Sequence, residues 1–330
     1  MGEVEVENRR DVRIERMTVH AMAIHEGMGK LVVSRKNSLP LASDILEQYN
    51  ILCGWLSVHE KVICPDNGGI ESVCFVGERI LCTHLNGSIT VADPHNDFMK
   101  RQQICPASLW SSCAIDDSRA ALVSHSATLY VFGLDEFIVL STLALGVDQR
   151  LFCVCNRNNL IAVGAMDNIF VVKNNFVVHK LVVARKSLET HQSDVLCLVT
   201  CEGRIHAAGV DPRIISIKQI AGKDFRIIQK RNGPIRDVRA MACYDDKIYA
   251  AGEDHDIYVA KGGCHVLTNQ WNRMVFLGGS LRMSRGLCFV DFWTNGSDEL
   301  NNSTGSFIVK QQPVYLARLY CPRKKAINLM

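Results

Sequence analysis

The side chains best suited to redox or metal chemistry in this chain are its 14 cysteines. A CxxC pair would predict a zinc or redox site, but the sequence contains none. The opening residues MGEVEVENRR hold no apolar leader, so we expect a reducing compartment and free thiols. Several cysteines recur at nearly the same place in successive strand-like runs, which predicts buried, unpaired and metal-free packing residues. These are Cys74, Cys113, Cys153 and Cys197, with Cys155 beside them.

Motifs for bond chemistry are absent from the chain. There is no nucleophile elbow, phosphate loop, dinucleotide fingerprint or HExxH pair. The 11 histidines are scattered, and those close to predicted hairpins are expected to hydrogen bond to a neighbouring repeat; they are His84, His125, His206 and His255. We therefore predict that the protein is not an enzyme and has no catalytic residue, cofactor, metal ion or small-molecule substrate.

Basic residues in predicted turns and links are the remaining chemical signal. Arg and Lys supply most of the sequence-independent contacts to nucleic acid phosphates. The alternative is an ordinary solvated surface, and the mild formal charge of +3 favours that alternative. The candidate contacts to RNA or to a protein partner are Arg185, Lys186, Arg213, Arg236 and Arg239, and Arg35 in the first hairpin has the same character.

The elements that must position these residues appear as six copies of one hairpin motif. Each copy reads as an apolar strand, a polar turn and a second apolar strand that begins at an apolar anchor. Successive anchors are 50, 40, 40, 45 and 43 residues apart, and a period of about 40–45 residues is typical of four-stranded propeller blades. The anchors are Leu39, Ile89, Leu129, Ile169, Ile214 and Ile257.

A strand-like run precedes five of the hairpins and completes the repeat, for example IESVCFV over 70–76 and LWSSCAI over 109–115. We expect these runs to be the innermost strands. The sequence thus predicts an all-β, WD-repeat-type β-propeller with degenerate repeats and seven blades, the alternative being that one blade is missing or incomplete. The expected domains are an N-terminal latch strand over 1–16, six blades over 17–263, and a closing blade with a basic tail over 264–330.

Several segments together resemble the cirhin family of WD-repeat proteins, over that family's first propeller. The most specific are the "GVDP" hairpin in RIHAAGVDPRIISIKQI and the strand and hairpin RDVRAMACYDDKIYAAGEDHDI. The other matching segments are KLVVSR, IESVCFVGERILCTHLNGSITVAD, LWSSCAI and VVHKLVVARK. The family's second propeller has no counterpart here.

This resemblance implies a non-enzymatic scaffold in ribosome biogenesis. Members of the family work in the small-subunit processome, within a transcription-coupled nucleolar subcomplex that supports pre-rRNA transcription and processing toward 18S rRNA. The implied partners are other processome proteins, with propellers and helical tails, and pre-ribosomal RNA, and the implied location is the nucleolus. No apolar run reaches the roughly 18–20 residues that span a membrane, so no membrane partner is expected. The competing readings are a generic WD-repeat adaptor of another multiprotein complex and a propeller enzyme.

Overall fold

The described part of the chain consists almost wholly of β-strands. In the computed structural model the described residues are 17–37, 44–52, 56–66, 69–96, 98–146, 150–183, 193–211, 213–220, 224–231, 237–244, 247–252, 257–261, 263–267, 281–284, 287–290 and 316–318. Among these residues no helix is long and apolar enough to cross a lipid bilayer. They form six four-stranded sheets and one three-stranded sheet, and within each sheet every strand pairs antiparallel with the strand next to it in sequence.

The first four sheets follow the chain in order. The first contains β1 (Met17–His25), β2 (Lys30–Asn37), β3 (Asp44–Leu52) and β4 (Leu56–Asp66). The second contains β5 (Ile70–Val76), β6 (Arg79–His84), β7 (Ser88–Ala92) and β8 (Met99–Gln103). The third contains β9 (Leu109–Ala114), β10 (Arg119–Ser124), β11 (Thr128–Gly133) and β12 (Ile138–Ala144). The fourth contains β13 (Leu151–Arg157), β14 (Leu160–Ala165), β15 (Asn168–Lys173) and β16 (Phe176–Val182).

The remaining three sheets continue the same pattern. The fifth contains β17 (Val195–Cys201), β18 (Arg204–Gly209), β19 (Ile214–Gln219) and β20 (Phe225–Arg231). The sixth contains β21 (Val238–Tyr244), β22 (Lys247–Gly252), β23 (Ile257–Lys261) and β24 (Gly263–Leu267). The seventh contains β25 (Leu281–Ser284), β26 (Leu287–Val290) and β27 (Leu316–Arg318).

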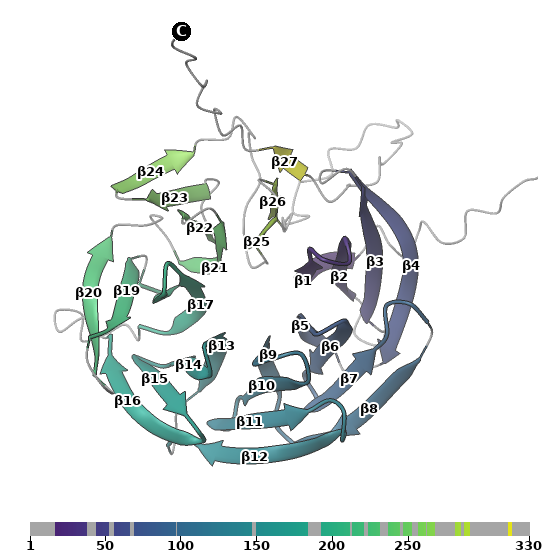
Figure 1. Ribbon diagram of the computed structural model, residues 1–330, viewed down its shortest axis with the longest axis horizontal. Helices are drawn as coiled ribbons and strands as arrows, with labels where there is room; N and C mark the ends of the chain where they lie inside the picture. The colour runs from purple at the N-terminus through teal and green to yellow at the C-terminus, as the bar shows by residue number, and fades with distance from the viewer. Residues whose placement is uncertain are drawn as a thin grey trace, which may run out of the picture.

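The sheets stand around a central axis with their first strands innermost (Figure 1). Each first strand contacts the first strand of the next sheet, and β25 contacts both β21 and β1, so the ring of sheets closes. The all-β propeller that the sequence predicts is therefore confirmed, as is the inner position of the runs that precede the hairpins. The latch strand expected near residues 12–16 lies outside the described residues, and the division of the chain into domains stays a prediction.

The hairpin of the repeated motif is the pair of middle strands in each of the first six sheets. Four of its six anchors lie at the start of the third strand and are almost completely buried; they are Ile89, Leu129, Ile169 and Ile214. Ile257 begins β23, and Leu39 lies outside the described residues. Burying an aliphatic side chain of this size contributes about 1.5–3 kcal/mol, so the anchors fix the hairpins against the neighbouring sheets.

The turn between β6 and β7 depends on one glycine. Gly87 has a φ of +79°, a region that L-residues with a Cβ rarely adopt. A Cβ at this position would also lie 2.0 Å from the carbonyl oxygen of Cys105, so the backbone of the next segment packs directly on the turn. Gly87 is thus required by this turn.

The core lies between adjacent sheets. One cluster joins Leu46 and Ile63 of the first sheet to Ile70 and Ile80 of the second, and comparable clusters bridge the later sheets. Such nearest-neighbour packing lets each sheet be stabilised by the two beside it. The repeated cysteines belong to this layer.

The cysteines occupy two repeated positions of the inner strands, and the prediction of a single shared position is wrong. Counted from the buried residue that opens each inner strand, Cys153 and Cys197 lie two residues on, whereas Cys74, Cys113 and Cys155 lie four residues on. All five are free thiols. Burial is confirmed for three of them, while Cys74 and Cys113 are only half-buried.

Candidate functional site

The backbone of six inner strands carries a β-bulge at the same place, close to where the strand begins. In each, one residue has no partner in the register with the second strand of its sheet. A bulge bends the strand and redirects the side chain of the extra residue, and proteins often place bulges beside functional sites. The six bulge residues are His20, Glu71, Trp110, Phe152, Leu196 and Arg239.

These six residues mark one face of the ring, which we call the bulge face. The turn between the second and third strands lies on the same face, because a backbone hydrogen bond joins that turn to the residue before the inner strand. The bond is 2.9–3.3 Å long and runs from the N–H groups of Leu85, His125, Met166 and Val210 to the carbonyls of Gly69, Ser108, Arg150 and Asp194, respectively. The fold therefore brings the turns and the bulges of consecutive sheets together.

Neighbouring bulge residues contact one another around the ring. His20 Nε2 lies 3.2 Å from Glu71 Oε2. The rings of Trp110 and Phe152 meet edge to face with centroids 6.0 Å apart, and the Trp110 ring also stacks on His125 at 5.6 Å. All are half-buried. One side of the ring thus offers an acid–base pair, and the next two strands offer an aromatic surface.

A group of carboxylates follows on the bulge face over the fourth to sixth sheets. Asp194 Oδ1 is buried and accepts no hydrogen bond. Burial raises the pKa of the Asp194 carboxyl, the charges of Asp167 and Asp237 raise it further, and the nearby Arg150 opposes them. Two carboxylates close to a third favour its neutral form. This sector therefore disfavours the approach of an anion to Asp194.

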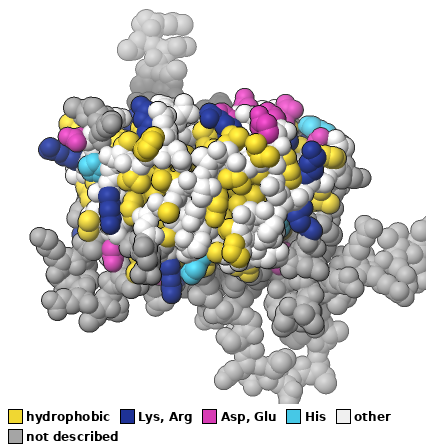
Figure 2. Space-filling model, turned by 90° about the horizontal axis from the view of Figure 1, so that it is seen from below, with side chains coloured by type: hydrophobic (Ala, Val, Ile, Leu, Met, Phe, Trp, Pro, Cys, Tyr) yellow, Lys and Arg dark blue, Asp and Glu magenta, His cyan; other side chains and the backbone are white. Residues whose placement is uncertain are grey.

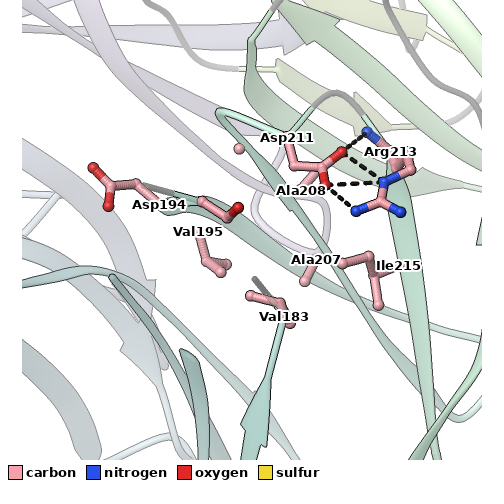
Figure 3. A pocket seen from close by; sticks show the side chains of 10 residues that line it. Val183, Asp194, Val195, Ala207, Ala208, Asp211, Arg213 and Ile215 are labelled. Atoms are coloured by element: carbon pink, nitrogen blue, oxygen red, sulfur yellow. Dashed lines mark hydrogen bonds and ion pairs between the residues drawn. The ribbon is translucent and has the colours of Figure 1, made fainter. Parts of the chain in front are cut away.

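A small cavity lies beside Asp194, between the end of the fourth sheet and the hairpin of the fifth (Figure 3). It is lined mainly by Val183, Val195, Ala207 and Ile215 and has a volume of about 10 Å³. Such a space holds about one water molecule. The cavity is therefore a packing gap, too small for a metabolite.

The basic residues predicted to contact RNA fall into two groups. Arg213 Nε donates to both carboxylate oxygens of Asp211, at 2.8 and 2.9 Å, and Arg239 Nη2 lies 3.1 Å from Asp237 Oδ2 (Arg213 in Figure 3). Both arginines are thus paired with the aspartate two residues before them. This pairing has a signal in the sequence, the pattern Asp-x-Arg. Arg185, Lys186 and Arg236 lie outside the described residues. The contribution of all five to RNA contact stays a prediction.

Arg35 is not the exposed turn residue that the sequence suggests. It lies within β2, and its guanidinium forms an ion pair with Glu47 of β3, both side chains being largely buried. Tyr49 donates a hydrogen bond of 2.7 Å to the same carboxylate, and burial together with Glu47 raises the pKa of Tyr49 to about 12. Arg35 is therefore part of the first sheet's internal structure.

Two of the histidines near the hairpins bond within their own sheet, and their bonding to a neighbouring repeat stays a prediction. His84 Nε2 lies 2.8 Å from Thr90 Oγ1, and His206 Nδ1 lies 2.9 Å from Ser216 Oγ. All four side chains are buried. Each pair joins the second strand to the third and supports the hairpin. His255 lies outside the described residues.

Among the described thiols, one pair departs from the prediction that all are free. Cys201 of β17 and Cys243 of β21 form a disulfide between the innermost strands of the fifth and sixth sheets. Elsewhere in the inner strands burial raises the pKa of Cys155 and Cys197 to about 12, so these thiols are poor nucleophiles. Within the described ranges no group of three or more His, Cys, Asp or Glu is arranged to hold a metal ion.

The opposite face of the ring carries an open groove between the first three sheets. It is lined by His25, Glu78, Arg79, His95 and Asp117, among others. Arg79 pairs with Asp135 at 2.7 Å, and Asp93 at the groove's margin accepts the N–H of His95. Arg79 and Asp93 are thus engaged in bonds of the turns. The bulge face, which presents an aromatic surface, is the better candidate for recognition.

Comparison with known proteins places the chain by its fold. No protein-family model and no curated protein sequence matches it. Among solved structures it is similar to the β-propeller domain of Cps50 (Swd1) from Myceliophteria thermophila, with a TM-score of 0.67 and 8% sequence identity. The match covers 83% of this chain and 93% of that domain. At this identity the likeness establishes the fold, and the chain is a β-propeller.

Proposed function

We propose that the protein is a non-enzymatic adaptor that binds protein partners through its bulge face. The observation that carries the proposal is the contrast between two neighbouring positions of the inner strands. The residue before the bulge is a buried aliphatic in five strands: Ile70, Leu109, Leu151, Val195 and Val238. The bulge residues themselves share no chemistry. A repeated backbone that presents varied side chains is suited to specific recognition.

A finer proposal follows from the resemblance to the cirhin family. We propose that the complex is the small-subunit processome and that the chain acts as a nucleolar scaffold in pre-rRNA transcription and processing. The support is the match of the two most specific segments, over 204–220 and 236–257, and the absence of a catalytic motif from the sequence. Pre-ribosomal RNA is the proposed nucleic acid partner, contacted by the five basic residues named above.

The test uses the tagged full-length protein, crosslinked in cells, followed by identification of the proteins and RNA that purify with it. Trp110→Ala combined with Phe152→Ala removes the aromatic sector of the bulge face. The matched control, Glu78→Ala with Asp117→Ala, alters the opposite face. We expect the aromatic variant to lose most protein partners while the control keeps them.

Two results would contradict these proposals separately. Equal recovery of partners by both variants, with unchanged folding by circular dichroism, would show that the bulge face is not the adaptor surface. Recovery of a specific complex that lacks nucleolar proteins and pre-rRNA would leave the adaptor proposal intact and overturn the processome proposal. Neutralising Arg185, Lys186 and Arg236 tests RNA contact, and unchanged RNA crosslinking with an unchanged melting temperature would count against it.

A further inference from the structure

The outermost strand of each four-stranded sheet is an edge, and the edges differ in charge. An edge strand exposes N–H and C=O groups that can pair with another chain, and charged side chains usually discourage this. β4, β8, β16 and β20 each contain at least one Lys, Arg, Asp or Glu. β12, with the sequence IVLSTLA, contains none. β24 is also uncharged but is only five residues long.

The side chains of β12 alternate in exposure, so the strand presents one row to solvent. Ile138, Leu140, Thr142 and Ala144 are exposed, and the residues between them are half-buried. Ile138 and Leu140 are 48% and 44% exposed. Figure 2 looks onto the wall of the ring that contains β12: hydrophobic and uncharged side chains fill its centre, and charged side chains lie mostly at its margins. Within the described residues β12 pairs only with β11.

We propose that β12 pairs antiparallel with β12 of a second copy of this chain, forming a two-fold dimer across a continuous eight-stranded sheet. With Ser141 on the two-fold axis, Leu140 lies opposite Thr142 of the other copy and Ile138 lies opposite Ala144. Every pair is uncharged, and the apolar and small residues match. A two-fold interface requires such self-complementarity.

The same operation is less favourable on three of the edges that carry charge. Pairing β8 about its centre would put Arg101 opposite Arg101, and pairing β20 would put Arg226 opposite Lys230. Like charges directly opposite destabilise a strand pair. Pairing β16 would set His179 against itself and leave Lys180 against Val178. Like charges therefore disfavour pairing of β8 and of β20, whereas β12 carries no charge that opposes pairing.

The interface is expected to be weak. One seven-residue strand pair buries less than a standard interface of about 1,200–2,000 Å². β12 also carries a bulge at Leu140 in its pairing with β11, a feature that twists an edge and limits the length of pairing. The dimer should thus form at micromolar or higher concentration and, lacking ion pairs, should be insensitive to salt.

The test is the mass of the purified full-length protein by sedimentation equilibrium over a range of concentrations, with and without 1 M NaCl. Thr142→Lys should weaken association about tenfold, because it places a charge against Leu140 of the other copy. Adding Leu140→Glu to that variant should restore association, since the introduced carboxylate of one copy then faces the introduced ammonium group of the other. The dimer of this double variant should weaken in salt. Phe176→Lys on β16, at a residue 73% exposed, is the control and should leave association unchanged.

Three outcomes would overturn the proposal. If the protein is monomeric at every concentration, the β12 dimer does not form. Pairing of β12 with a strand of another protein would not rescue the proposal. Dissociation by Phe176→Lys but not by Thr142→Lys would place the interface elsewhere. Failure of the double variant to restore a dimer, with an unchanged melting temperature showing that it folds, would exclude the antiparallel register.

Discussion

The disulfide between Cys201 and Cys243 should make the stability of the ring sensitive to reductant. Their Cα atoms are 5.7 Å apart, within the usual range for a disulfide, and 42 residues separate them in sequence. Closing a loop of this length restricts the unfolded chain by about 4 kcal/mol in the chain-entropy model. For a domain of 330 residues this corresponds to a melting temperature roughly 6 °C higher.

The assay is thermal unfolding followed by circular dichroism, with and without reductant, after peptide mapping has identified the linked pair. Wild type should lose about 6 °C on reduction. Cys201→Ser combined with Cys243→Ser should melt close to reduced wild type and ignore reductant. Cys74→Ala, at a free half-buried thiol, is the control: it should keep the full response to reductant.

Two results would refute this reasoning. If mapping shows the linked peptide and its reduction leaves the melting temperature unchanged, the entropic argument fails for this loop. If mapping of the unreduced protein finds every cysteine free, Cys201 and Cys243 are neighbouring thiols without a disulfide. That result would agree with the reducing compartment expected from the sequence.

Three further predictions concern folding. Arg35→Leu should lower the free energy of unfolding by about 3–5 kcal/mol, because the buried Glu47 carboxylate loses its ion pair. Adding Glu47→Leu should recover part of that loss, measured by urea unfolding. Gly209→Ala should destabilise the fold by more than about 3 kcal/mol or prevent folding, because the added Cβ would lie 1.9 Å from the Asp194 carbonyl oxygen. Gly27→Ala, where only a histidine side chain is nearby, is the control and should be tolerated. Soluble yield and melting temperature distinguish the two variants. Asp194→Asn should raise the melting temperature at pH 7. The raised pKa of Asp194 favours the protonated carboxyl in the folded state, so wild-type stability is lost as pH rises through the folded pKa. The gain in melting temperature from Asn should therefore shrink below the ordinary carboxyl pKa. An equal gain at pH 3 and pH 7 would contradict this.

Local pattern predicted the fold because each blade is built from neighbouring residues. The anchors Ile89 and Leu129 are short-range signals that repeat with the blade, and the structure buries both at the start of a third strand. The two repeated cysteine positions were merged in the sequence because they lie two residues apart, so strand alternation sends both side chains to the same face. The bulge near the start of the inner strands was not predicted at all. Bulges depend on how sheets pack and leave no clear mark on the sequence.

The site was less predictable, since charge and exposure depend on what lies across a sheet or between sheets. Arg35 looked exposed, but Glu47 on the next strand pairs with it. The disulfide had one indirect signal: the 42-residue separation is close to the 43-residue spacing of the last two anchors, which places both thiols near the same point of adjacent inner strands.

The sequence by itself determined the repeat, the strand order and the all-β propeller, because alternation, turn residues and period are local properties of the chain. Only the tertiary structure decided which side chains meet. Closing the ring set Trp110 beside Phe152, His20 beside Glu71, and Cys201 beside Cys243. These pairs join residues about 40–50 positions apart, and their contact depends on how neighbouring blades pack around the axis.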